Sequence, residues 1–226
     1  ENSAVLFLDF LKKLEADFNN LPSPATSPIR RAAIVMNANP FSKGHRFLVE
    51  SALKECDQLL LLVLSDESDN GFTFDQRFEM VRLGCADLPQ VLTAAGGPYA
   101  VSTASFPSYF YPPSELDENS LFLNDEAELD AALFTRIAQH LGISMRFVGS
   151  EPFSAITNFY NRVLSRELAD LGIELRIIER LRQNGEAVSA SRVREFLKNE
   201  NYSAAEKLLP PTTWAFLKHL AGGCTK

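Results

Sequence analysis

Short apolar runs alternate along this chain with longer segments that repeat apolar side chains at helical spacing. A continuous apolar run predicts a strand covered on both faces, and apolar positions three or four apart predict an amphipathic helix. The predicted strands are 32–36, 59–64, 91–93, 99–105, 143–148 and 173–178. The predicted helices are 43–56, 74–85, 125–141, 154–171, 190–199, 202–208 and 211–221. This alternation is typical of an α/β protein, with an open parallel sheet, helices on both faces and a small C-terminal helical extension.

The two ends of the chain show a different pattern from its middle. Residues 1–20 predict a short edge element followed by an amphipathic helix. That helix is expected to bury Leu11, Leu14 and Phe18. Residues 21–31 contain three prolines, and proline continues neither a helix nor a strand ladder. We therefore expect a connector, a domain and a short tail, over 1–30, 31–221 and 222–226.

Composition and charge argue against several classes of function. The formal net charge is −7, whereas a general nucleic-acid binder usually presents a basic face. No apolar run approaches the roughly 18–20 residues that span a membrane, and the N-terminal residues lack the order of a signal peptide. The three cysteines form neither a C-x-x-C pair nor a zinc-type cluster with histidine. We expect a cytoplasmic protein with no nucleic-acid partner, no membrane partner and no protein-held metal.

A polar turn joins the first strand of the predicted domain to its first helix. Its candidate residues are Asn37, Asn39, Pro40, Phe41, Ser42, Lys43, Gly44 and His45. A helix start offers free backbone N–H groups and the positive end of the helix dipole, where phosphate binds readily. Gly44 is expected to let the backbone approach a ligand, while Lys43 and His45 add donors and positive charge. On spacing alone, a capping or packing role for His45 is the commoner interpretation.

Two later turns have the same character. The stretch "VSASRVREF" (188–196) opens a helix with two serines and two arginines, Ser189, Ser191, Arg192 and Arg194. It fits either a capped surface helix or a second anion site at which arginine holds phosphate oxygens. Another predicted strand is followed by Gly149, Ser150 and Glu151, a position that faces the ligand crevice of an open parallel sheet. Glu151 fits either a hydrogen-bonding carboxylate or a helix-start acid.

The two helix-opening motifs resemble those of a known superfamily. "NPFSKGH" (39–45) is similar to the T/H/S-x-G-H signature of the nucleotidyltransferases, and "VSASRVR" (188–194) is similar to their late I-S-x-T/S-x-x-R motif. The longer blocks "AIVMNANPFSKGHRFLVESA", "FTFDQRFEMVRLGCADLP", "VSTASFPSYF" and "VGSEPFSAITNFYN" resemble the citrate (pro-3S)-lyase ligase family, also called acetate:citrate-lyase ligase. The resemblance covers roughly residues 31–221 and implies a Rossmann-like HxGH nucleotidyltransferase fold.

The resemblance also implies an activity. Such enzymes use ATP and acetate to acetylate the thiol of the phosphoribosyl-dephospho-CoA group on the acyl carrier subunit of citrate lyase. Acetyl adenylate is the implied intermediate, AMP and pyrophosphate are released, and Mg²⁺ is expected on the phosphates, held mostly by water. The implied catalytic residues are His45, Ser42, Lys43 and Arg194. The implied ATP-binding residues are Asn37, Asn39, Pro40, Phe41, Gly44, Gly149, Ser150, Glu151, Ser189 and Ser191.

Family members usually carry an N-terminal acetyltransferase-like domain, so residues 1–30 are expected to hold the end of that domain and the connector. Two other functions stay open. One is a phosphopantetheine-type adenylyltransferase, which would release a dinucleotide. The other is a fragment that binds a nucleotide or a partner without turnover. Arg77 and the loop 106–110 also match family blocks, but a surface arginine and an aromatic core edge explain them equally well.

Overall fold

Five parallel strands form the central sheet of the computed structural model, which describes residues 3–24, 28–67, 71–110, 121–150 and 155–223. The strands are β1 (Arg31–Met36), β2 (Gln58–Val63), β3 (Val91–Ala95), β4 (Ile143–Gly149) and β5 (Glu174–Ile178). Their order is β3-β2-β1-β4-β5, and each neighbouring pair is parallel. The predicted open parallel sheet is therefore confirmed. Because the strand order reverses between β1 and β4, a crevice opens beyond their carboxyl ends.

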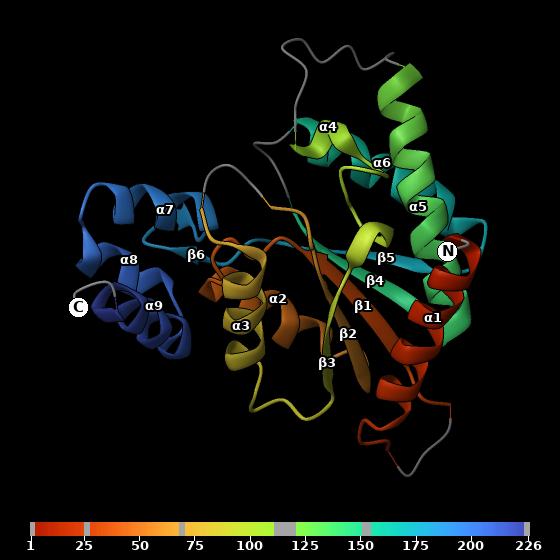
Figure 1. Cartoon of the computed structure of the whole chain (residues 1–226), viewed down its shortest axis with the longest axis horizontal. Helices are drawn as coiled ribbons and strands as arrows, with labels where there is room; N and C mark the ends of the chain where they lie inside the picture. Colours follow the sequence, from red (N-terminus) through yellow and green to blue (C-terminus); the bar gives the residue numbers. More distant parts are fainter. Residues whose placement is uncertain (1–2, 25–27, 68–70, 111–120, 151–154, 224–226) are drawn as a thin grey trace.

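Helices cover both faces of this sheet (Figure 1). One face carries α1 (Ser3–Asn19), α5 (Leu121–Leu141) and α6 (Ala155–Ala169). The other face carries α2 (Lys43–Ala52) and α3 (Phe74–Gly84). Successive side chains of a strand point to opposite faces, so Leu60 and Leu62 of β2 join the first core while Leu59 and Leu61 join the second. Burial on both faces explains why the strands have continuous apolar sequences.

The C-terminal part extends the α2–α3 side of the molecule (Figure 1). It consists of a short antiparallel hairpin and three helices. These elements are β6 (Arg182–Gln183), β7 (Glu186–Ala187), α7 (Ala190–Lys198), α8 (Tyr202–Leu208) and α9 (Pro211–Gly223). Val193, Leu208 and Leu217 pack into the same core as α2 and α3. The three predicted C-terminal helices are confirmed, and their packing fixes the start of α7 beside the crevice.

Two predictions about local structure are wrong. The N-terminal residues form one continuous helix, α1, without a separate edge element, and the predicted Leu11, Leu14 and Phe18 are the buried side chains of this helix. Residues 99–105 do not form a strand. They follow the 3-10 turn η1 (Gly97–Tyr99), where Pro98 lacks a ladder N–H, and Val101 has a positive φ of 43°. The 106–110 loop contains a short helix, α4 (Pro107–Phe110).

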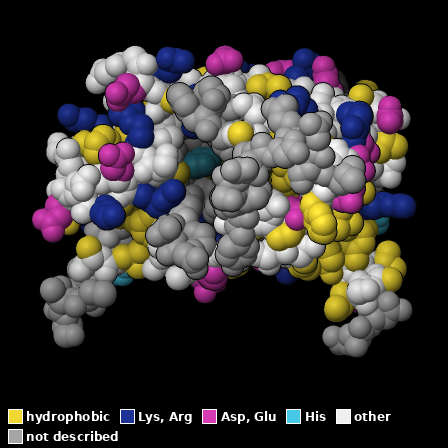
Figure 2. All heavy atoms as spheres, turned by 90° about the horizontal axis from the view of Figure 1, so that it is seen from above, with side chains coloured by type: hydrophobic (Ala, Val, Ile, Leu, Met, Phe, Trp, Pro, Cys, Tyr) yellow, Lys and Arg dark blue, Asp and Glu magenta, His cyan; other side chains and the backbone are white. Residues whose placement is uncertain are grey.

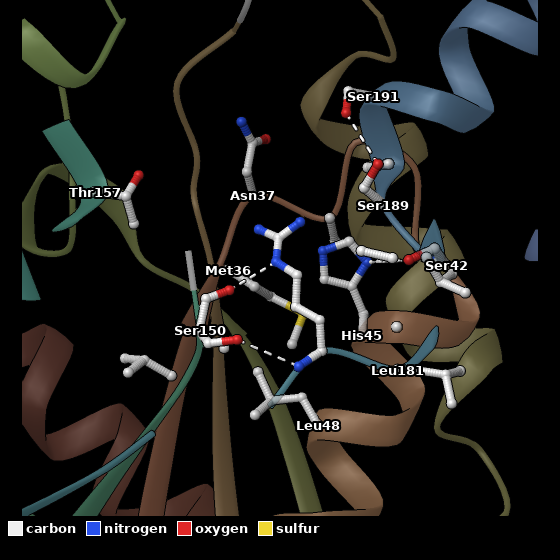
Figure 3. A pocket seen from close by; sticks show the side chains of 18 of the residues that line it. Met36, Asn37, Ser42, His45, Leu48, Ser150, Thr157, Leu181, Ser189 and Ser191 are labelled. Carbon is white, nitrogen blue, oxygen red and sulfur yellow. Dashed lines mark hydrogen bonds between the residues drawn. The ribbon is translucent and has the colours of Figure 1, made fainter. Parts of the chain in front are cut away.

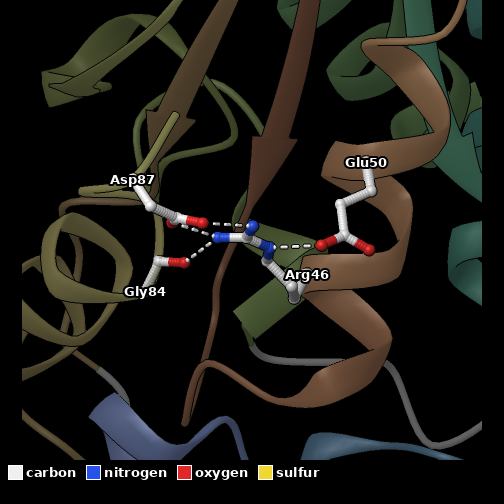
Figure 4. Close-up of polar contacts among 4 residues, drawn as sticks. All are labelled: Arg46, Glu50, Gly84 and Asp87. Atoms are coloured by element: carbon white, nitrogen blue, oxygen red, sulfur yellow. Dashed lines mark hydrogen bonds and ion pairs between the residues drawn. The ribbon is translucent and has the colours of Figure 1, made fainter. Parts of the chain in front are cut away.

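An arginine one residue after His45 fixes α2 against α3 (Figure 4). Arg46 Nε donates to Glu50 Oε1 at 2.7 Å, and its Nη1 donates to the carbonyl of Gly84 at 2.7 Å. The same guanidinium pairs with both carboxylate oxygens of Asp87, at 2.6 and 2.8 Å. These bonds join the first turn of α2 to the end of α3, so the helix that carries His45 has a fixed rotation.

Candidate active site

A cavity of about 960 Å³ lies beyond the carboxyl ends of β1 and β4. Figure 2 shows this face hollowed near its middle, with lysine and arginine side chains gathered toward the C-terminal helices. The cavity is lined by the ends of the strands and by the first turns of α2 and α7. Ten of the predicted site residues line it: Asn37, Asn39, Ser42, Gly44, His45, Gly149, Ser150, Ser189, Ser191 and Arg194. The topology therefore brings together three turns that are far apart in the sequence.

The first turn of α2 holds the imidazole of His45 in one orientation (Figure 3). The backbone N–H of Ser42 donates to His45 Nδ1 at 3.0 Å, and Ser42 Oγ lies 3.0 Å from the same nitrogen. Behind the ring, the buried Phe41 is stacked at 5.8 Å between centroids. A Cβ on Gly84 would lie 2.4 Å from the Phe41 ring, so glycine at position 84 leaves space for the ring that supports His45. The second ring nitrogen is left facing the cavity.

These contacts also fix the protonation of His45. Because Nδ1 accepts from a backbone N–H, a neutral ring must carry its proton on Nε2. Burial, together with the positive charge of Arg180, lowers the pKa of His45 to about 4. His45 is therefore a neutral hydrogen-bond donor near pH 7. The expectation that it adds positive charge is wrong for the protein without a ligand, because the desolvated ring lies beside an arginine.

An NMR titration of His45 is expected to show this lowered pKa. The imidazole should titrate near pH 4, below the ordinary value of about 6.5. Between these two pH values the unfolded chain, whose histidine is protonated, binds more protons than the folded chain. The contribution of neutral His45 to the free energy of unfolding is therefore lost as the pH falls from about 6.5 to 4. Denaturant unfolding over this range should give a shallower pH dependence for His45→Gln. A His45 pKa at or above 6.5 would contradict this assignment.

The start of α7 supplies the opposite wall of the cavity. Ser189 caps the helix by accepting from the backbone N–H of Arg192 at 3.3 Å, and its Oγ lies 3.0 Å from Ser191 Oγ (Figure 3). Arg194 Nη1 donates to the carbonyl of Asn39, which connects α7 to the turn before α2. Two serine hydroxyls, an arginine and a helix N-terminus thus line one side of the cavity, an arrangement that suits an anion.

Gly44 also allows a close approach within the protein itself. A Cβ at this position would lie 2.7 Å from the backbone carbonyl of Val188, which is closer than real Cβ contacts come. The glycine is required because the segment before α7 passes directly over the first turn of α2. The close approach is therefore between two parts of the protein, and it holds the two helix starts around one cavity.

Arg180 is a cavity residue that the sequence analysis missed. It follows β5, and its Nε donates to the carbonyl of Ser150 at 2.7 Å. Its backbone N–H donates to Ser150 Oγ at 3.3 Å. Arg180 is also the charge that helps to lower the pKa of His45. The available signal was a basic residue two positions after a predicted strand, because the ends of parallel strands face the ligand crevice.

Three predicted residues lie elsewhere. The Lys43 side chain donates from Nζ to the carbonyl of Lys207 at 2.7 Å and is not part of the cavity lining, so its predicted catalytic role does not match the structure. Phe41 is fully buried beneath His45, where it supports the ring. Pro40 is buried in the same turn and is likewise absent from the lining. Glu151 lies outside the described residues.

Arg77 is buried beneath the strand ends, which excludes the surface position that the sequence left open as one of two interpretations. Its side chain has an exposed fraction of 0%. The guanidinium donates to the carbonyls of Asn37, Leu64, Asp66 and Phe72 and to Asn37 Oδ1, at 2.8–3.2 Å. It therefore holds together the carboxyl ends of β1 and β2 and the segment before α3. Its role is to shape the turn that contains Asn37.

Within the described ranges, no group of three or more His, Cys, Asp or Glu side chains is placed to hold a metal ion. In the same part of the chain, no helix is long and apolar enough to cross a membrane.

The parallel sheet with its cavity at the β1–β4 switch defines a nucleotidyltransferase-like Rossmann protein. A pantothenate synthetase from Thermus thermophilus has this fold, with a TM-score of 0.52 and 18% identity over 86% of this chain and 68% of that one. A bifunctional NMN adenylyltransferase/ADP ribose pyrophosphatase from Francisella tularensis, complexed with AMP and a manganese ion, has a TM-score of 0.50 and 16% identity, over 85% of this chain and 49% of that one. At such identities the likeness shows the fold alone.

Residues 31–217 match the family described as citrate lyase ligase C-terminal domain, and the chain belongs to this family. It is 40% identical over 194 residues to the citrate (pro-3S)-lyase ligase of Klebsiella pneumoniae, covering 84% of this chain and 55% of that protein. It is 37% identical over 193 residues to the corresponding ligase of Escherichia coli, covering 83% and 53%. The chain thus spans about half the length of the curated relatives it matches.

Proposed function

We propose that this chain activates acetate with ATP and transfers the acetyl group to a thiol of the citrate lyase acyl carrier subunit, on its phosphoribosyl-dephospho-CoA group. The observation that carries the proposal is that several hydrogen-bond donors line one cavity. These donors are the Nε2–H of His45, the serines at the start of α7, Arg180 and Arg194. Donors and positive charges on two sides suit the phosphates of a nucleoside triphosphate. Family membership supports the choice of substrates.

The first half-reaction joins acetate to the adenylyl group. A carboxylate oxygen attacks the α-phosphorus of ATP, a new P–O bond forms, and the bond to the bridging oxygen breaks as pyrophosphate leaves with the electron pair. The reaction needs positioning and charge neutralisation more than a protein nucleophile. His45 Nε2–H donates to an α-phosphate oxygen as negative charge develops there, and Ser42 keeps the ring in place.

The remaining phosphates are assigned to the α7 side of the cavity. Ser189, Ser191 and Arg194 hold the β- and γ-phosphates, and the turn at Gly149 and Ser150 receives the adenosine. Mg²⁺, when bound, neutralises phosphate charge.

In the second half-reaction the carrier thiol attacks the acetyl carbon of acetyl adenylate. The C–S bond forms, AMP leaves with the electrons of the C–O bond, and the thiol proton passes to solvent.

The cysteines of this chain that the structure describes do not suit the role of the attacking thiol. Burial raises the pKa of both Cys56 and Cys85 to about 12, so neither forms a thiolate near neutral pH.

Isotope exchange between pyrophosphate and ATP tests the proposal. Labelled pyrophosphate should enter ATP only when acetate is present, and AMP should appear together with acetylated carrier when the thiol form of the carrier subunit is added. A dinucleotide product formed with phosphopantetheine would instead indicate an adenylyltransferase. ATP binding without exchange in acetate would leave a binding module and contradict the proposed activity.

A further inference from the structure

Arg146 is a buried cation in the middle of β4. Its exposed fraction is 2%, and its guanidinium carbon lies 4.2 Å from the ring centroid of Phe134 and 5.6 Å from that of Tyr160. Its Nη2 donates to the Tyr160 hydroxyl at 3.1 Å. The charge is therefore enclosed mainly by aromatic carbon on the α5–α6 side of the sheet.

Two of the three guanidinium nitrogens make no hydrogen bond to the part of the chain that the structure describes. Among the described residues, Nε and Nη1 of Arg146 make no hydrogen bond. The nearby acid Asp130 is already engaged, since it accepts from the N–H of Val101 at 2.6 Å, from Ser105 Oγ at 2.8 Å and from the Tyr160 hydroxyl at 2.5 Å. Buried polar atoms are nearly always hydrogen-bonded, and buried charges are nearly always paired. An unpaired arginine at this depth indicates a missing anion.

This arginine lines the same cavity as His45. The cavity lining on the α6 side of the sheet includes the buried Leu64, Val101 and Tyr160, together with the polar Thr157 and Asn161. The donors assigned to the phosphates come instead from the starts of α2 and α7. The guanidinium of Arg146 thus combines one positive charge with the aromatic rings of Phe134 and Tyr160. That chemistry suits a small carboxylic acid, with its carboxylate on the guanidinium and its alkyl group against carbon.

We infer that Arg146 binds the carboxylate of the acid substrate and that the surrounding apolar side chains select a short acyl chain. This inference rests on the proposed function and specifies where its acid substrate lies. An arginine there holds the acid beside the adenylate site while the phosphates occupy the α2–α7 side. Arg146 is then a substrate-binding residue for acetate and not for ATP.

Arg146→Met tests the inference because methionine keeps much of the length and removes the charge. In pyrophosphate exchange, the KM for acetate should rise at least tenfold while the KM for ATP changes less than twofold. Arg82→Met is the matched control. Arg82 forms a surface pair with Glu79, its side chain is 55% exposed, and both KM values should stay at wild-type level. An unchanged acetate KM in Arg146→Met, or a raised ATP KM alone, would overturn the inference.

Direct binding separates this inference from the proposed function. Line broadening of ¹³C-acetate by the protein, with a non-hydrolysable ATP analogue present, should be seen for wild type and lost in Arg146→Met, whether or not exchange occurs. Broadening without exchange would contradict the activity but keep the acid site, and equal broadening by both proteins would remove Arg146 from that site.

If Arg146→Met does not fold, Arg146→Lys replaces it as the test variant. It keeps the charge but loses the planar fork, and a wild-type acetate KM in that variant would count against the inference.

Discussion

Replacing His45 with alanine is expected to lower acetate-dependent ATP–pyrophosphate exchange by about 10²–10³-fold. The variant loses the Nε2–H donor that faces the cavity, and a preorganised donor of this kind contributes about 2.7–4 kcal/mol to transition-state stabilisation. Because His45 is neutral, the loss is that of a hydrogen bond and not of a net charge. The exchange rate at saturating ATP and acetate measures it.

The same variant should remain folded. Ser42 loses the Nδ1 acceptor at the helix start, and the loss of such a cap costs about 1 kcal/mol, which denaturant unfolding can measure. Ser42→Ala provides a comparison, since it removes one hydroxyl contact to Nδ1 and leaves the backbone donor in place. Its exchange rate should therefore fall less than that of His45→Ala. Wild-type exchange in His45→Ala would refute the assigned role of the imidazole.

Replacing Arg77 with methionine is expected to have the largest effect on stability. The variant leaves the carbonyls at the ends of β1 and β2 and before α3 buried without their donor. Removing one partner from such a buried charged network costs about 3–5 kcal/mol in the free energy of unfolding. Urea unfolding followed by far-UV circular dichroism should show this as a lower midpoint.

Arg82→Met controls for this experiment as well. Arg82 lies on the same helix as Arg77 and pairs with Glu79 at the surface, so its loss should leave the urea midpoint unchanged. Arg77→Lys should fall between the two variants, because lysine keeps the charge but cannot reach as many carbonyls at once. Equal midpoints for Arg77→Met and wild type would show that the buried network does not hold the strand ends together.

Local patterns were sufficient for most of the elements. Continuous apolar runs indicated the strands, and the polar turn before the apolar positions at helical spacing indicated the start of α2. The incorrect predictions concern segments whose structure depends on neighbouring parts of the chain. The run 99–105 contains apolar residues but pairs with no strand of the described chain, and its backbone turns at Val101. Apolar content cannot distinguish a strand from a buried turn when the partner lies elsewhere in the chain.

Helix geometry explains one incorrect site prediction. Residues two apart on a helix lie on different faces, and the Lys43 side chain accordingly points away from the cavity that His45 lines. The structure places Lys43 against Lys207 of α8. Arg77 shows the opposite case, since a helical arginine is usually exposed. Its burial depends on carbonyls supplied by two strand ends and a loop.

The sequence by itself determined the alternation of strands and helices, and with it a parallel sheet whose polar turns lie at one edge. It also determined two motifs with free helix N-termini, because caps and periodicity are local properties. Only the tertiary structure decided that Arg180 lies beside His45, that the pKa of the His45 ring is lowered, and that two nitrogens of the buried Arg146 make no hydrogen bond to any described residue. These features depend on desolvation and on neighbours brought from distant segments, and a linear pattern carries neither.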